Sequence, residues 1–101
     1  MTYRVTASWP GGFNGDVRVA VNSGSVNGWT LTFTFPGNQR ITNAWNAVVT
    51  QTGAAVSARD AGHNAVITAG GNASWGFNGS VTGTNANPTA FSLNGVACQV
   101  A

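Results

Sequence analysis

A period-two alternation of apolar and polar residues recurs along this chain and restricts it to β-structure. In residues 29–35, three threonines alternate with tryptophan, leucine and phenylalanine. Residues 16–21, 73–77 and 91–93 alternate in the same way, and residues 96–100 make a last short segment of this kind. Because successive side chains of a strand point to opposite faces, each segment predicts a strand with one buried and one solvated face.

Turn-forming residues separate these segments. No stretch has a helical period longer than one turn, and the polar residues 82–89 predict a loop. Short strands joined by such turns are typical of an all-β fold, an antiparallel β-sandwich of immunoglobulin-like or jelly-roll-like type. At this length the chain is expected to be a single domain, residues 1–101. The turn signals are Pro10-Gly11-Gly12, Asn22-Ser23-Gly24, Asn27-Gly28, Ala69-Gly70-Gly71, Asn78-Gly79 and Asn94-Gly95.

Charged residues are rare in this sequence. They make up 6% of the chain, against about 25% in an ordinary domain. The four arginines, Arg4, Arg18, Arg40 and Arg59, are scattered singly and predict no basic patch, so nucleic acid is not an expected partner. No apolar run reaches the length of a membrane span and no signal peptide is present, so no membrane partner is expected. Solubility must come from amides and hydroxyls, which match the hydroxyls of sugars.

The chain lacks the side chains that most hydrolytic sites need. A glycosidase usually needs two carboxyl groups across its substrate, and Asp16 and Asp60 are the only carboxylic side chains in the sequence. A Ser–His–Asp triad would have to use His63, but no serine lies in a nucleophile-elbow motif. One His, one Cys and two Asp also lack the spacing of a zinc site. The sequence therefore predicts a non-catalytic protein without a metal or a cofactor.

The four tryptophans fall into two pairs. Trp29 and Trp75 lie in alternating segments and are predicted to be core residues. Trp9 and Trp45 instead lie among small and amide residues, which is how a protein displays a flat ring at its surface. Exposed apolar surface usually marks a binding site, and a flat, uncharged polysaccharide surface fits two displayed rings. The alternative is that both rings are buried, as tryptophans are on average.

Five motifs follow one another in a specific order along nearly the whole chain. They are Trp9-Pro10-Gly11-Gly12-Phe13, residues 28–36, Ala44-Trp45-Asn46, residues 76–80, and residues 91–95 with Cys98. Together they resemble the bacterial cellulose-binding modules of carbohydrate-binding module family 2, cellulose-binding subtype. The resemblance implies an antiparallel β-sandwich appended to a secreted cellulase, xylanase or oxidative polysaccharide enzyme. It also implies a monomer that binds crystalline cellulose, and often chitin, on a flat face with three aromatic residues in line.

The resemblance also assigns roles to individual residues. Trp9 and Trp45 match two of the three aromatic positions, and the third falls at His63, where the family usually has tryptophan. His63 is either a weaker stacking platform or a loop histidine without a role. Gly12 carries a subtype signal, because xylan-binding relatives tend to have arginine there, which props the neighbouring tryptophan upright. The polar sugar contacts map to Asp16, Asn43, Ser74 and Asn78; Asp16 and Ser74 depart from the usual amides, and Ala7 replaces a common asparagine.

Cys98 departs from the family pattern. The family joins its two ends by a disulfide between the cysteine that matches Cys98 and one just before the first strand, a position that would fall before Met1. The resemblance therefore implies that Cys98 is a free thiol in a folded but less stable domain. A bridge that closes nearly the whole chain stabilises by about 4–5 kcal/mol in the chain-entropy model.

Two other functions stay open at this stage. A structural or adhesion module of immunoglobulin-like type would have the same fold, because β-sandwiches carry many unrelated functions. An engineered scaffold derived from a binding module would have both the fold and the motifs. Exposure of both Trp9 and Trp45 on one face would favour the binding module, since an adhesion module has no need for it.

Overall fold

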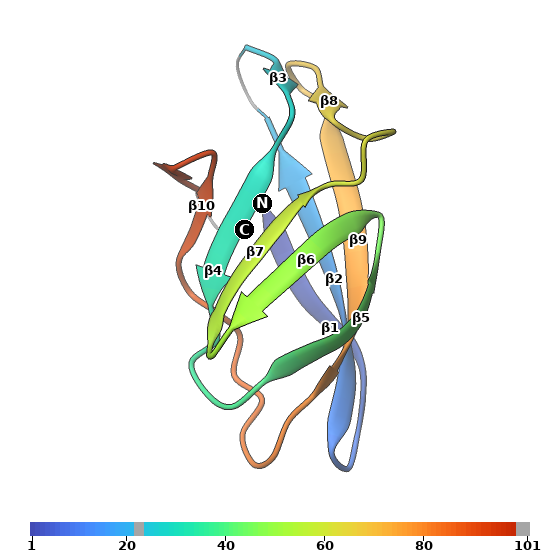
Figure 1. Ribbon diagram of the computed structural model, residues 1–101, viewed down its shortest axis with the longest axis vertical. Coiled ribbons are helices and arrows are strands. Elements are labelled where there is room, and N and C mark those ends of the chain that lie inside the picture. The colour runs from blue at the N-terminus through green and yellow to red at the C-terminus, as the bar shows by residue number, and fades with distance from the viewer. Residues whose placement is uncertain (22–23, 99–101) are drawn as a thin grey trace.

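The computed structural model describes residues 1–21 and 24–98, and within these ranges the chain is all β (Figure 1). No part of them forms a helix long and apolar enough to cross a membrane. The strands are β1 (Thr2–Trp9), β2 (Gly12–Ala20), β3 (Val26–Asn27), β4 (Thr30–Thr34), β5 (Arg40–Trp45), β6 (Ala47–Thr52), β7 (Ala55–Asp60), β8 (Val66–Ile67), β9 (Asn72–Ser80), β10 (Phe91–Leu93) and β11 (Val96–Ala97).

Two antiparallel sheets pack face to face and form a β-sandwich. The first has four strands in the order β1-β2-β9-β5, and the second has five in the order β11-β10-β4-β7-β6. Strands β3 and β8 pair separately as a short two-stranded ribbon. In Figure 1, β4, β7 and β6 lie in front of β1, β2 and β9. The predicted fold class, an all-β antiparallel sandwich, is therefore confirmed.

Aromatic side chains fill the space between the two sheets. The rings of Tyr3 from the first sheet and Phe33 from the second meet edge to face, with centroids 6.2 Å apart. Trp29 and Trp75 are each 1% exposed, which confirms that they are core residues. The indole N–H of Trp29 donates to the carbonyl oxygen of Asn64 at 2.8 Å, so its one polar atom is satisfied inside the core.

Two polar atoms in this core have no partner among the described residues: the hydroxyl of Tyr3 and the indole nitrogen of Trp75. Burial raises the pKa of the Tyr3 phenol far above its ordinary value, because a buried phenolate loses its hydration. Tyr3 therefore stays protonated well into alkaline solution.

The alternating segments correspond to real strands, whereas three of the edge strands were not predicted. Strands β4 and β10 lie within the predicted segments, β2 and β9 extend beyond theirs, and residues 82–89 form the expected loop. Strands β1, β5 and β6 went unrecognised because they lie at sheet edges and bury few side chains, so their alternation is weak. The inner strand β7 and the short strands β3 and β8 were missed as well.

The C-terminal prediction is only partly tested. Strand β11 covers Val96 and Ala97, and Val100 lies outside the described residues, as do Asn22 and Ser23 of one predicted turn. Cys98 is a half-buried free thiol that packs against the core.

Candidate functional site

The outer side of the four-stranded sheet carries nearly all of the predicted site residues. Strand pairing arranges its outward side chains in rows of directly opposed positions. We call this surface the aromatic face. Its three central rows are Trp9–Gly12–Ser80–Arg40, Ala7–Asn14–Asn78–Asn43 and Arg4–Asp16–Gly76–Trp45, and the next row adds Arg18 and Ser74.

Trp9 lies against the backbone of the neighbouring strand. It ends β1, and the turn at Pro10 and Gly11 brings Gly12 of β2 directly opposite it. A Cβ atom placed on Gly12 would be only 2.5 Å from the Trp9 ring nitrogen, so the indole occupies the space that a side chain would need. The ring is 48% exposed, which confirms that it is displayed at the surface.

Trp45 is supported in the same way at the opposite edge of the sheet. It ends β5 opposite Gly76 of β9, and a Cβ on Gly76 would be 2.6 Å from three atoms of the Trp45 ring. Its exposed fraction, 45%, is close to that of Trp9. Each ring therefore extends from an edge strand over a glycine of an inner strand. Gly76 is a functional candidate that the sequence reasoning missed, although it alternates with Ser74 and Asn78.

A one-residue bulge in each edge strand points these rings outward. In β1, Val5 is opposite Gly15 but Ala7 is opposite Asn14, so Thr6 is an extra residue. If Thr6 were instead paired in regular register, Trp9 would lie on the same side of β1 as Val5, which packs against the core.

The bulge in β5 has the same effect. Ile41 is opposite Gly79 and Asn43 is opposite Asn78, which leaves Thr42 as the extra residue. If Thr42 were instead paired with Asn78 in regular register, Trp45 would be opposite Trp75 and would point into the core. The hydroxyl of Thr42 donates to the carbonyl oxygen of Asn78 at 3.0 Å and ties the bulge to β9.

The spacing of the two rings follows from the register. Gly12 and Asp16 lie four residues apart on β2, and Asp16 is opposite Gly76. The ring over Gly12 and the ring over Gly76 are thus separated by about 13 Å along the strands and one strand spacing across them. That distance is longer than one sugar ring, so the two indoles would contact different sugars.

Three asparagines form the row between the two rings. Asn14, Asn78 and Asn43 lie side by side on β2, β9 and β5. Asn43 and Asn78 were predicted site residues, and Asn14 was not, although it alternates with Gly12 and Asp16 on the same face. The side-chain oxygen of Asn14 is buried and has no partner among the described residues.

His63 lies in the loop after β7 and is exposed. Its neighbour Asn64 holds this loop in place, because the Asn64 amide donates to the carbonyl oxygen of Asn46 at 2.7 Å. Asn46 directly follows Trp45, so the structure places His63 beside the Trp45 end of the aromatic face rather than on the sheet.

The two carboxylates have different surroundings. Asp16 lies on the aromatic face between Arg4 and Gly76. Asp60 lies at the end of β7 on the other sheet, where its carboxylate accepts the backbone N–H groups of Trp29 and Gly62, each at 3.1 Å. Asp60 therefore stabilises a loop, and the two carboxylates do not form a pair.

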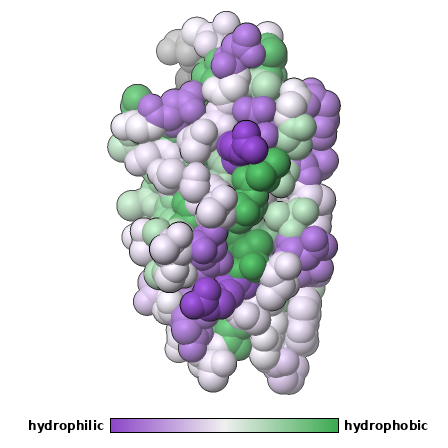
Figure 2. All heavy atoms as spheres, viewed as in Figure 1, coloured by the Kyte–Doolittle hydropathy of each residue, from purple (hydrophilic) through white to green (hydrophobic). Residues whose placement is uncertain are grey.

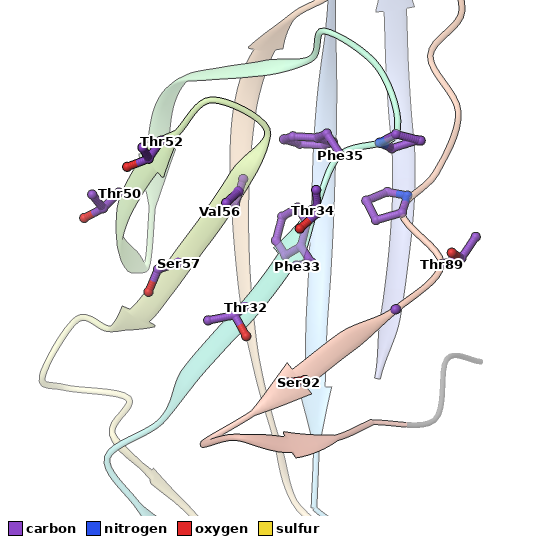
Figure 3. A pocket seen from close by; sticks show the side chains of 14 residues that line it. Thr32, Phe33, Thr34, Phe35, Thr50, Thr52, Val56, Ser57, Thr89 and Ser92 are labelled. Carbon is purple, nitrogen blue, oxygen red and sulfur yellow. The ribbon is translucent and has the colours of Figure 1, made fainter.

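The opposite side of the sandwich carries hydroxyls instead of aromatic rings. Ser92, Thr32, Ser57 and Thr50 form a row across β10, β4, β7 and β6, and with Thr34 and Thr52 they make what we call the hydroxyl face. These side chains line a shallow groove of about 660 Å³ (Figure 3). Figure 2 shows this side of the molecule as a largely near-neutral surface crossed by an apolar strip.

Comparison with known proteins identifies relatives along the whole chain. The model of a family described as "Cellulose binding domain" matches residues 1–98. Exoglucanase A of Cellulomonas fimi is 48% identical over 95 residues, which are 93% of this chain and 11% of that enzyme. Endoglucanase CelA of Streptomyces lividans is 43% identical over 98 residues, 96% of this chain and 21% of the enzyme. The chain thus spans a small part of each of these relatives.

A solved structure has the same architecture. The chitin-binding domain of Chi18aC from Streptomyces coelicolor superposes with a TM-score of 0.74 at 35% identity. The match covers 95% of this chain and 90% of that domain, so the two sandwiches correspond over almost their full length.

Proposed function

The chain belongs to the cellulose binding domain family, and on that premise we propose that residues 1–101 form a non-catalytic module that binds crystalline cellulose through the aromatic face. The observation that carries this proposal is the support of both Trp9 and Trp45 by glycine backbones on one side of one sheet. Rings held in this way present flat surfaces, and a flat crystalline polysaccharide needs no pocket.

Stacking on sugar rings provides the binding free energy. A pyranose ring of a β-linked glucan carries axial C–H bonds on its faces, and an indole lying on that face removes both surfaces from water. Each tryptophan has about half of its surface exposed, so at about 25 cal/mol per Å² its burial is worth about 2–3 kcal/mol. Two rings give about 4–6 kcal/mol before entropy losses, which corresponds to a millimolar affinity for one short chain. Useful affinity therefore requires an extended surface with many overlapping sites.

Polar side chains around the rings complete the proposed site. Sugar hydroxyls at the ring edges both donate and accept hydrogen bonds, as side-chain amides do. Asn14, Asn43 and Asn78 contact them between the two indoles. Asp16 and Ser74 extend the polar contacts toward the Trp45 end, where His63 is a third and smaller platform.

The biological role extends this proposal. The relatives named above are glucanases of which the chain covers a small fraction, and a chitin-binding domain has the same fold. We infer that the module anchors a secreted polysaccharide-degrading enzyme to its substrate as a monomeric unit, and that chitin is a second ligand. Hydrolysis belongs to another domain of such an enzyme.

The decisive experiment is a pull-down of the parent and of the Trp9→Ala/Trp45→Ala variant onto microcrystalline cellulose, with insoluble xylan as a second surface. We expect the parent to bind cellulose and the double variant to lose binding while it keeps the circular dichroism of the parent. Val48→Ala/Val96→Ala is the matched control, because both valines are exposed apolar residues outside the aromatic face. If the tryptophan variant binds as well as the parent, or if the parent does not bind, the chain shares the fold of its family but not the proposed binding function.

A further inference from the structure

The few charges of this protein are unevenly distributed over the sandwich. Three of the four arginines that are scattered along the sequence lie on one face of the fold, although they are spread over different rows of it. Arg4, Arg18 and Arg40 all lie on the aromatic face with Asp16, whereas Arg59 and Asp60 lie on β7 of the other sheet. Three arginines and one aspartate give the aromatic face a formal charge of +2, which is the net charge of the entire chain.

The arginines and the indoles occupy opposite corners of this face. Arg40 on β5 shares a row with Trp9, and Arg4 on β1 shares a row with Trp45. Because each indole extends over an inner strand, the backbone of each arginine lies two strand spacings, about 10 Å, from the glycine beneath a ring. A glycan surface that covers both rings therefore also covers both cations.

The four charged groups have different neighbours across the strands. Asp16 is directly opposite Arg4 and offsets part of its charge. Arg18 is opposite Thr2 and Ser74, and Arg40 is opposite Ser80, so neither has a carboxylate in its row. Both are exposed. His63 is the other titratable side chain near this face, and it adds no negative charge.

From this arrangement we propose that the aromatic face prefers β-linked glycan surfaces that carry carboxylate groups, such as oxidised cellulose, over neutral ones. This inference rests on the proposed function. The indoles bind the sugar faces, while Arg18 and Arg40 pair with carboxylates at the margins of the contact. Guanidinium keeps its proton at all relevant pH values and binds a carboxylate through two parallel hydrogen bonds. Arginines needed only for solubility would not have to gather on the one face that carries the rings.

The expected effect is modest and depends on salt. Exposed ion pairs are worth about 0.2–1 kcal/mol each, so two arginines should produce a preference of about two- to thirtyfold at low ionic strength. At about 1 M salt the Debye length falls to about 3 Å, and the preference should disappear. Binding through the indoles persists under those conditions.

The test compares adsorption isotherms on microcrystalline cellulose and on the same cellulose with its surface hydroxymethyl groups oxidised to carboxylates. Each protein is measured on both surfaces at low and at high salt, and the ratio of the two affinities is the readout. The variants are Arg18→Gln, Arg40→Gln and their combination. Arg59→Gln is the matched control, because it removes the same charge from the hydroxyl side of the molecule.

The parent should bind the oxidised surface about two- to thirtyfold more tightly at low salt, and the double variant should lose this ratio while Arg59→Gln keeps it. Equal affinity of the parent for both surfaces would overturn the proposal. So would an equal loss in Arg59→Gln, because net charge alone would then explain the preference. Failure of the parent to bind unmodified cellulose would instead contradict the proposed function, so the two failures are distinguishable.

Discussion

The two outer faces of this sandwich follow the same alternation of strand side chains but differ in what they present. The aromatic face has two indoles, three asparagines and three arginines, whereas the hydroxyl face has rows of serine and threonine. A groove of about 660 Å³ lies on the hydroxyl face, while the candidate site lies on the aromatic face. Concavity is therefore a poor guide for a ligand that is itself flat, and the chemistry of the outward rows is a better one.

The two faces also differ in the strands that build them. The rings of the aromatic face come from the edge strands β1 and β5, and inner-strand glycines lie beneath them. On the hydroxyl face, the inner strands β4 and β7 supply short side chains that need no such support. A large ring can lie flat on a sheet only where the neighbouring strand has no side chain.

The largest effect is expected from filling the space beneath a ring. Gly76→Ala should weaken cellulose binding by about tenfold or more, because the new Cβ displaces the Trp45 indole and about half of its stacking energy is lost. Adsorption isotherms on microcrystalline cellulose measure the change. Gly37→Ala is the control, since its Cβ would be 2.9 Å from the Gln39 side chain and would strain the fold away from this face. An equal loss in both variants would indicate that instability, and not the ring, reduces binding.

Removing amides from the central row should have a smaller effect. Asn14→Ala and Asn78→Ala should each reduce cellulose affinity about two- to tenfold, because one hydrogen bond is worth about 0.5–1.5 kcal/mol. Thr32→Ala and Ser57→Ala on the hydroxyl face remove polar groups of similar size and should leave the isotherm unchanged. A loss of binding in the latter pair would break the distinction between the faces.

Enlarging the proposed third platform tests how far the aromatic face extends. His63→Trp should tighten cellulose binding severalfold, because a larger ring buries more apolar surface, and His63→Ala should loosen it. The same depletion assay measures both. Unchanged affinity in the two variants would limit the face to Trp9 and Trp45.

The core that both faces share should affect stability but not binding. The Tyr3 hydroxyl has no partner among the described residues, so Tyr3→Phe should leave the free energy of unfolding unchanged or raise it by about 1 kcal/mol. Because burial raises the pKa of the Tyr3 phenol in the folded state, ionisation of this phenol favours the unfolded state once the pH exceeds the unfolded pKa. The contribution of the phenol to the free energy of unfolding is therefore complete below the unfolded pKa and decreases as the pH rises above it. Thermal unfolding from pH 7 to pH 11 should therefore show a smaller alkaline loss in Tyr3→Phe. An identical decline in both proteins would contradict this.

Local sequence patterns could predict the inner strands other than β7, and whether each tryptophan is buried or exposed. Trp29 and Trp75 are buried and Trp9 and Trp45 are exposed, as their neighbours indicated. The family resemblance added a set of polar positions, and the fold brings Asp16, Asn43, Ser74 and Asn78 onto one face. Whether these residues contact a glycan stays a prediction.

Pairing between distant strands was beyond local patterns. Strands β2 and β9 are neighbours in the sheet but are separated by 51 residues, so the row that joins Asn14 to Asn78 depends on a register that no short motif contains. The placement of Arg4, Arg18 and Arg40 on one face has the same origin. The bulged edge strands β1 and β5 also could not be recognised from local patterns, because one extra residue interrupts the period of two that identifies a strand.

The bulges have a consequence for anyone who edits this protein. Thr42 lies outside the strand pairing, so deleting it should leave Ile41 opposite Gly79 and Trp45 opposite Gly76 in a strand without a bulge, and the ring should stay at the surface. The same holds for Thr6 and Trp9. In these two strands the register matters more than the number of residues, and a change that draws the extra residue into the regular pairing would turn a ring toward the core.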